Sequence, residues 1–117
     1  MKTSEKENLA SAVTALNALG QENRLATFRA LVEAGRGGMA AGAIAKRLGV
    51  APSSLSFHLT TLKHAGLVNE RRESRSIIYT ANYAAMSRLI AFLMTNCCAA
   101  DRIDPQLVDA FTETESS

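Results

Sequence analysis

The sequence has almost none of the features that mark secreted, membrane or disulfide-rich proteins. Its only two cysteines are adjacent among 117 residues, so they cannot build a disulfide framework, and a reducing compartment is expected. Charged or polar residues interrupt every apolar stretch well before the roughly 18 residues that a transmembrane helix needs. We therefore expect no signal peptide and no membrane partner, and we predict a cytoplasmic protein. The length predicts one domain.

Residues that could support catalysis are also scarce. The two histidines, His58 and His64, lack a nucleophile and an acid arranged beside them, so no enzyme is predicted. His58 should be a partly buried, hydrogen-bonded residue, whereas His64 should face outward near a helix end, where a phosphate contact and a helix-dipole interaction are equal options. Residues 35–38 are rich in glycine but lack the lysine of a phosphate-binding loop, which indicates a turn. No obligatory cofactor is expected.

What the sequence does contain is a central segment, residues 44–79, in the order helix, turn, helix and two short strands. Gly49 can take the left-handed conformation that ends a helix. Pro52 suits the start of a second helix because its missing amide would have no partner there. This helix is predicted over residues 52–65, with a left-handed cap at Gly66 and a buried stripe formed by Leu55, Leu59 and Leu62. The order is that of a winged helix-turn-helix that reads DNA.

The face of the second helix opposite its leucines contains no carboxylate, so it can press into an anionic major groove. The hairpin that follows, predicted over residues 68–80, would place arginines on phosphates or in the adjacent minor groove. A surface hairpin can also carry charge only for solubility and to protect its edges. Contacts to base edges are predicted for Ser53, Ser54, Ser56, Phe57 and Thr60. Contacts from the helix or wing to the DNA backbone are predicted for Thr61, Lys63, Arg72 and Arg75.

The charge distribution along the chain supports this interpretation. Between Arg36 and Thr80, seven basic residues stand against two acidic ones, a net charge of +5. From Asp101 to the end, one basic residue stands against five acidic ones, a net charge of −4. A polyanion would therefore bind the middle of the chain and repel the acidic tail, residues 105–117. The alternative class is an interaction module that uses the winged fold to bind proteins, with weak and non-specific affinity for DNA.

Two amphipathic helices are predicted at the ends of the domain. Residues 5–19 carry a stripe of larger apolar side chains, and residues 82–98 carry a wider one. The first stripe is formed by Leu9, Val13, Leu16 and Leu19. A core this small needs only part of this surface, so a homodimer through the N- and C-terminal helices is predicted. The fold class is thus mainly α with a small β-hairpin wing, a single winged helix-turn-helix domain over residues 1–104.

The chain resembles the ArsR/SmtB family of metal-responsive bacterial repressors over nearly all of this domain. The matching segments, in chain order, are residues 19–25, 41–45, 53–59, 65–68 and 71–75. The resemblance implies a homodimer that binds a near-palindromic double-stranded operator and leaves it when an inducer reaches a cysteine or histidine site. The wing tip has Ser74 where glycine is frequent in the family, which should stiffen the turn.

The inducer sites of the founding family members are missing. Residues 39–42, which match the cysteine site of the first arsenic repressors, contain no thiol, carboxylate or imidazole, and residues 82–96 contain no histidine or carboxylate for a zinc site. Cys97 and Cys98 instead resemble a variant arsenic site at the end of the last helix, without the third cysteine that often follows. The resemblance implies that trivalent arsenic, inorganic or organic, or antimony binds this pair and releases the repressor from DNA. Arsenite has three bonds, so a third ligand must come from elsewhere.

Two other interpretations of the cysteine pair remain open. Cys97 continues the apolar stripe of the last helix, so the pair could be structural, although Cys98 lies about 100° around the helix and falls off the stripe. The thiols could also sense oxidants or persulfide. Because adjacent cysteines form a disulfide only with strain, such a bond would join two subunits.

Overall fold

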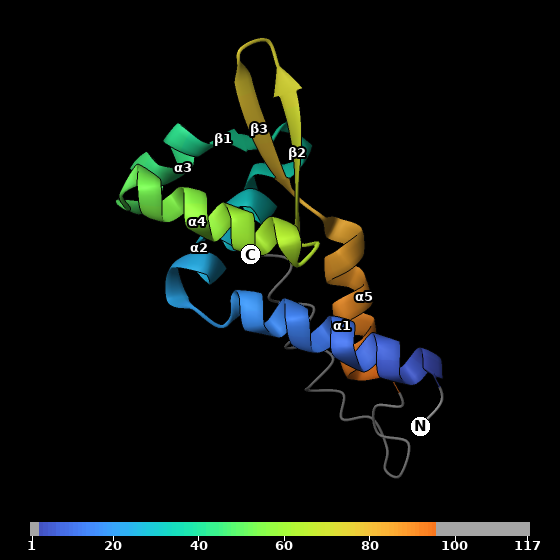
Figure 1. Cartoon of the computed structure of the whole chain (residues 1–117). Coiled ribbons are helices and arrows are strands. Elements are labelled where there is room, and N and C mark those ends of the chain that lie inside the picture. Colours follow the sequence, from blue (N-terminus) through green and yellow to red (C-terminus); the bar gives the residue numbers. More distant parts are fainter. Residues whose placement is uncertain (1–2, 96–117) are drawn as a thin grey trace, which may run out of the picture.

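Helices make up most of the structure, and two strands project from them as a wing (Figure 1). The computed structural model describes residues 3–95 of the chain. Within them the helices are α1 (Thr3–Leu19), α2 (Glu22–Ala34), α3 (Ala41–Leu48), α4 (Pro52–His64) and α5 (Tyr83–Met94). A 3-10 turn, η1 (Gly35–Gly37), precedes the short strand β1 (Met39–Ala40), and the wing consists of β2 (Val68–Glu73) and β3 (Ser76–Ala81). Among the described residues, no helix is long and apolar enough to cross a membrane.

The helix-turn-helix forms as its local sequence predicts. Gly49 ends α3 in the left-handed conformation, with φ of 67° and ψ of 32°, and α4 begins at Pro52. At the other end of α4, Gly66 has φ of +78°. The amide of Gly66 donates to the Lys63 carbonyl at 2.9 Å, and the amide of Leu67 donates to the Leu62 carbonyl at 3.0 Å. These two bonds form the predicted glycine cap, which turns the chain from α4 into the wing.

The core lies where α2, α3 and α4 meet the base of the sheet. The predicted leucine stripe of α4 is buried there, with 2% or less of each side chain exposed. It packs in one cluster with Phe28, Leu31, Ile44 and Leu67. Fully burying a leucine contributes roughly 1.5–3 kcal/mol, so this stripe alone holds α4 firmly on the domain. The opposite face of α4 is thereby fixed toward solvent.

Most of the apolar stripe of α1 is exposed on the single chain, as the predicted dimer requires. Leu9, Val13 and Leu16 are 42–48% exposed, whereas the side chains that α1 buries against its own chain are Ala12, Ala15 and Ala18. Alanines let α1 lie close to its neighbours because they have no side chain beyond Cβ. The larger apolar side chains of α1 are therefore on the surface of the single chain, available for another subunit.

The sheet has a third strand that the sequence analysis did not predict. Its order is β1-β3-β2, and β1 pairs with β3 through Met39 opposite Tyr79 and Ala40 opposite Ile78. Gly38 precedes β1 with φ of +67°, and a Cβ atom there would collide with the carbonyl oxygen of Tyr79. The glycine-rich turn, predicted only as a turn, thus also lets β1 reach the edge of the wing.

The wing tip stores backbone strain at Ser74. Glu73 pairs with Ser76, so Ser74 and Arg75 form a two-residue turn, and Ser74 takes a φ of +53°. A left-handed conformation costs a non-glycine residue roughly 1–2 kcal/mol, and glycine loses about 0.5–1 kcal/mol more chain entropy on folding. Ser74→Gly should therefore raise the free energy of unfolding by up to about 1 kcal/mol. Ser74→Val should lower it, since β-branched residues tolerate this conformation worst. Thermal unfolding followed by circular dichroism measures both, and equal melting temperatures for the two variants would contradict the assignment.

Helix α5 ends earlier than predicted. Thr95 leaves the helix with φ of −56° and ψ of 128°, and its hydroxyl donates to the carbonyl of Ala91 at 2.7 Å. The prediction of a helix to residue 98 is therefore wrong at Thr95. Cys97, Cys98 and the acidic tail, residues 105–117, lie outside the described residues.

Candidate nucleic-acid interface

The outward face of α4 has the chemistry predicted for a recognition helix. Phe57 is 65% exposed, which is unusual for a large aromatic side chain. Four small hydroxyl residues surround it on the exposed surface, namely Ser53, Ser54, Ser56 and Thr60. The face thus offers one apolar group for a thymine methyl and several short polar groups for base edges, with no carboxylate to repel DNA.

The threonines of α4 are oriented by their own helix. The Thr60 hydroxyl donates to the Ser56 carbonyl at 2.9 Å, and the Thr61 hydroxyl donates to the Phe57 carbonyl at 3.1 Å. With its proton used in this way, each oxygen is left as an acceptor. An acceptor on this face suits the exposed amino groups of adenine and cytosine in the major groove. Thr60 is exposed and Thr61 half-buried, so Thr60 is the better placed of the two.

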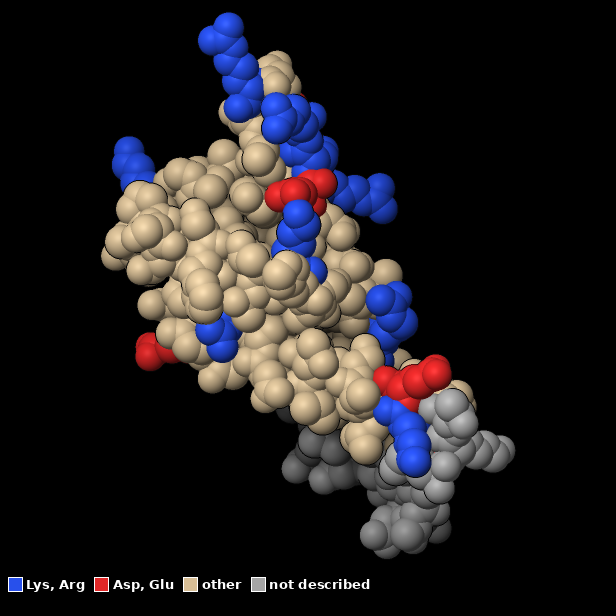
Figure 2. Space-filling model, viewed as in Figure 1, with Lys and Arg blue, Asp and Glu red and all other residues tan. Residues whose placement is uncertain are grey.

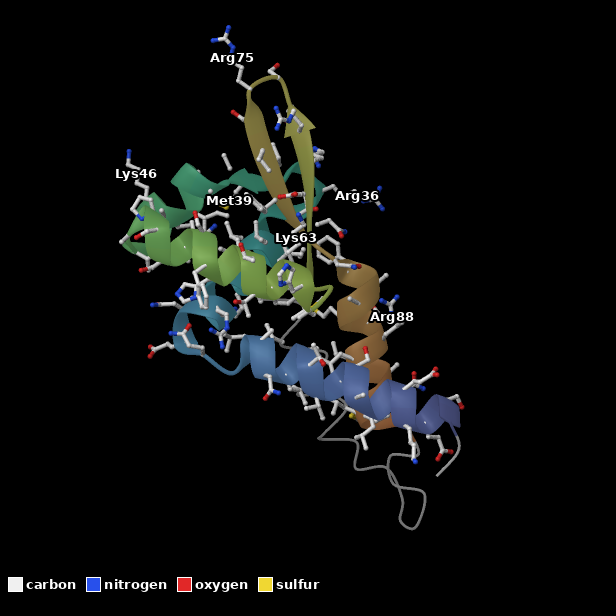
Figure 3. The ribbon with its side chains drawn as sticks, in the orientation of Figure 1. Arg36, Met39, Lys46, Lys63, Arg75 and Arg88 are labelled. Carbon is white, nitrogen blue, oxygen red and sulfur yellow. The ribbon has the colours of Figure 1, made fainter. Side chains whose placement is uncertain are left out.

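The basic side chains predicted to contact the DNA backbone differ in whether an acidic residue of the protein already binds them. The Lys63 ammonium lies 2.5 Å from the Glu70 carboxylate, so part of its charge is already neutralised. Arg72 and Arg75 are exposed on the wing, and no ion pair holds either of them within residues 3–95. Figure 3 shows Arg75 pointing away from the wing tip. Basic side chains gather along the wing in Figure 2, where a polyanion would meet them.

The two histidines take different positions. His58 is buried, as predicted, but no described residue bonds its Nδ1 atom, so the predicted hydrogen bond is wrong for that nitrogen. Its ring lies at 68° to that of Phe57, with centroids 6.2 Å apart. This edge-to-face arrangement supports the exposed aromatic ring from behind. His64 is exposed in the last turn of α4, as expected.

Asn82 is a residue that the sequence analysis did not single out. It caps α5, its side-chain oxygen accepting from the Ala85 amide at 3.1 Å. Its side-chain amide donates to the Gly66 carbonyl at 2.9 Å, and its backbone amide donates to the Leu67 carbonyl at 2.8 Å. An asparagine just before an apolar helix is a usual N-cap signal, but its bond to the distant Gly66 turn had no local signal. Asn82 thus ties the start of α5 to the end of the recognition helix.

The described part of the chain brings no set of three or more His, Cys, Asp or Glu side chains together in a way that could hold a metal ion. Cys97 and Cys98 follow α5 by three and four residues but are not among the described residues.

Known proteins with related sequences are bacterial regulators. Residues 19–71 match a family profile described as a helix-turn-helix domain. The transcriptional activator HlyU of Vibrio cholerae is 32% identical over 97 residues, which cover 83% of this chain and 87% of that protein. The nodulation protein NolR of Rhizobium meliloti is 33% identical over 78 residues, 67% of this chain and 62% of that protein.

Solved structures agree with this relationship. An ArsR-like transcriptional regulator from Rhodococcus sp. RHA1 is 29% identical, with a TM-score of 0.66 over 73% of this chain and 77% of that chain. The homodimeric winged helix-turn-helix domain of Mb0332 from Mycobacterium bovis is 26% identical, with a TM-score of 0.64 over 86% and 88%. The chain therefore belongs to the ArsR family of winged helix-turn-helix transcription regulators, which bind DNA and are not enzymes.

Proposed function

We propose that the chain is a homodimeric repressor that leaves its operator when trivalent arsenic, as arsenite or methylarsenite, or antimonite binds Cys97 and Cys98. The observation that carries the proposal is that the only two thiols of the chain are vicinal and come three and four residues after the end of α5. Thiolates are the ligands that soft, thiophilic centres prefer. Methylarsenite already has one carbon bond, so two thiolates complete it, whereas arsenite needs a third ligand from the partner subunit, a small thiol or hydroxide.

The exposed apolar surface supports the dimer. Leu9, Val13 and Leu16 lie on α1, and Leu93 and Met94 on α5; each is at least 42% exposed. Figure 1 shows α1 and α5 beside each other, away from the wing, and the two helices contact one another. A twofold axis through this pair would bury both faces against the same faces of a second copy. The two recognition helices would then stand about 34 Å apart, one turn of DNA.

Asn82 supports a route from the thiols to DNA. It links the start of α5 to the carbonyl of Gly66, in the turn that follows α4, and α5 ends three residues before Cys97. An inducer that favours another position of α5 in the dimer would change the spacing or the angle of the recognition helices. Allosteric coupling free energies of about 1–3 kcal/mol are usual, which corresponds to roughly 5- to 150-fold in operator affinity.

The test is release of the purified dimer from operator DNA across a panel of ligands. Arsenite, methylarsenite and antimonite should release it, whereas zinc should not; cadmium, another soft ion, tests how far the site selects for arsenic. If methylarsenite acts at lower concentration than arsenite, the two thiolates complete the site without a third protein ligand. Failure of all three trivalent inducers would contradict the proposal.

A second candidate is a redox- or persulfide-responsive regulator of the same fold. It is favoured by a solved structure described as reduced HlyU from Vibrio cholerae, which is 27% identical, with a TM-score of 0.59 over 80% of this chain and 98% of that chain. Intact-mass measurement after peroxide or persulfide treatment separates this candidate from the first. A modified mass at Cys97 or Cys98, together with loss of DNA binding in the absence of arsenic, would favour it.

Arg75→Ala tests the wing contact. A side chain that neutralises one phosphate contributes about 0.9 to the slope of log affinity against log salt concentration. We expect this variant to bind all duplexes roughly three- to tenfold more weakly and to lose about one unit of that slope. Fluorescence anisotropy of labelled duplexes at several salt concentrations measures both. An unchanged slope would remove Arg75 from the interface.

A further inference from the structure

Arg71 lies on the wing, but its guanidinium is bound to the protein itself. Its Nη1 donates to the Arg36 carbonyl at 2.9 Å, and its Nη2 donates to the Gly37 carbonyl at 3.0 Å. Its Nε donates to the Glu73 carboxylate at 3.1 Å, which orients the planar group. A side chain from β2 thus reaches across to η1, the turn that leads into β1 and α3. This basic residue is therefore engaged within the domain, unlike its neighbour Arg72.

The preceding residue holds the wing from its other face. Successive side chains of a strand point to opposite sides, so Glu70 and Arg71 leave β2 in opposite directions. Glu70 pairs with Lys63 near the end of α4, and Arg71 binds η1. Figure 3 shows Lys63 and Arg36 at the base of the wing, far from Arg75 at its tip. The base of the wing is thus tied to the recognition helix on one face and to the start of the helix-turn-helix on the other.

We infer that Arg71 is a positioning residue for DNA binding: by clamping β2 to the two carbonyls of η1, it fixes the direction of the wing while α4 occupies the major groove. The inference rests on the proposed wing contact of Arg75. Beyond the pairing of β1 with Ile78 and Tyr79, the wing has only two strands, and a two-stranded hairpin is only marginally stable by itself, so its direction depends on such ties at the base. Only a planar, forked donor can bond both carbonyls while keeping its Nε on Glu73. Lysine would keep the charge and lose the clamp.

The decisive comparison is between Arg71→Lys and Arg71→Ala. If Arg71 positions the wing, both variants should bind operator about three- to tenfold more weakly, and both should lose about one unit of salt slope, because Arg75 no longer meets its phosphate. Arg29→Lys, on α2, is the matched control: it makes the same substitution at an exposed arginine that is not among the predicted DNA contacts, so affinity should stay within about twofold of the natural protein and the salt slope should not change. Normal behaviour of Arg71→Lys with a weakened Arg71→Ala would make Arg71 a simple phosphate contact and overturn the inference.

A double-mutant cycle gives a second readout. Arg75→Ala should cost much less in the Arg71→Ala background than in the natural protein, whereas Lys46→Ala, on α3, should cost the same in both backgrounds. An equal cost of Arg75→Ala in both backgrounds would overturn the inference. Circular dichroism and melting curves confirm that each variant is folded.

A measurement without DNA separates this inference from the proposed wing contact. A fluorophore attached at Ser74→Cys, in a background where Cys97 and Cys98 are serine, reports the local motion of the wing tip. Arg71→Ala and Arg71→Lys should both lower its anisotropy, and Arg72→Lys should not. If the Arg71 variants lower the anisotropy while Arg75→Ala leaves operator affinity and salt slope unchanged, the clamp is supported and only the wing contact is disproved. An unchanged anisotropy would disprove the clamp.

Discussion

A protein in which Cys97 and Cys98 are both serine should bind operator DNA as tightly as the natural protein and stay bound when methylarsenite or arsenite is added. The natural protein should lose roughly 5- to 150-fold of its affinity under the same conditions. The reason is that serine oxygen is a hard, mostly protonated donor, whereas trivalent arsenic bonds strongly to thiolates. Titration of arsenical into a preformed complex with labelled duplex, followed by anisotropy, measures the release.

Single substitutions sharpen this experiment. With one thiolate left in each subunit, no single chain can hold the arsenic by two bonds, so each single variant should respond much like the double variant. Release that persists in a single variant would mean that the remaining thiolates of two subunits bind the arsenic together. Unchanged affinity without arsenic is the control for folding and for the DNA face. Full release of the double variant would mean that arsenic acts elsewhere, and the proposed inducer site would be wrong.

The second large effect is expected at the exposed stripe of α1. Val13→Glu should convert the dimer to monomers at micromolar concentration, because an unpaired carboxylate would have to be buried in the interface. Operator affinity should fall by about 100-fold or more, since the two half-sites would no longer be bound by one linked pair of recognition helices. Sedimentation velocity gives the mass, and anisotropy gives the affinity.

Ala10→Glu is the matched control for this variant. It adds the same charge to the same helix, but Ala10 lies about 100° around the axis from Leu9, on a face that carries neither the exposed stripe nor the buried alanines. It should remain dimeric and bind operator normally. A dimeric Val13→Glu variant, or two variants that behave alike, would place the dimer interface elsewhere.

The helix-turn-helix could be predicted because its signals are local. Gly49, Pro52 and Gly66 each specify a backbone conformation from their own chemistry, and the leucines of α4 repeat at helical spacing. The alanine face that α1 packs against its own chain could not be predicted in the same way. Periodicity shows which residues share a face, but it does not show whether that face meets the same chain or another, and here the smaller alanines pack inward.

Contacts between distant segments were also invisible in the sequence. Strand β1 is two residues long and exists because β3, far along the chain, offers it a partner. The different roles of Arg71 and Arg72 also depend on a distant segment. The two residues have the same chemistry, but only the Arg71 side chain reaches the carbonyls of η1. The predicted end of the last helix was wrong because Thr95, whose composition suits a helix, takes an extended conformation with ψ of 128°.

The double attachment of Asn82 makes α5 a lever. The helix has 12 residues and so is about 18 Å long. The residue before it, Asn82, is its point of attachment, because the Asn82 side chain donates a hydrogen bond to the Gly66 carbonyl. A displacement of about 1.5 Å at the Met94 end would tilt such a rod by about 5°. The tilt would reach the turn that follows the recognition helix through the bond between Asn82 and the Gly66 carbonyl. We therefore expect a displacement at the far end of α5 to be felt at the DNA-reading surface.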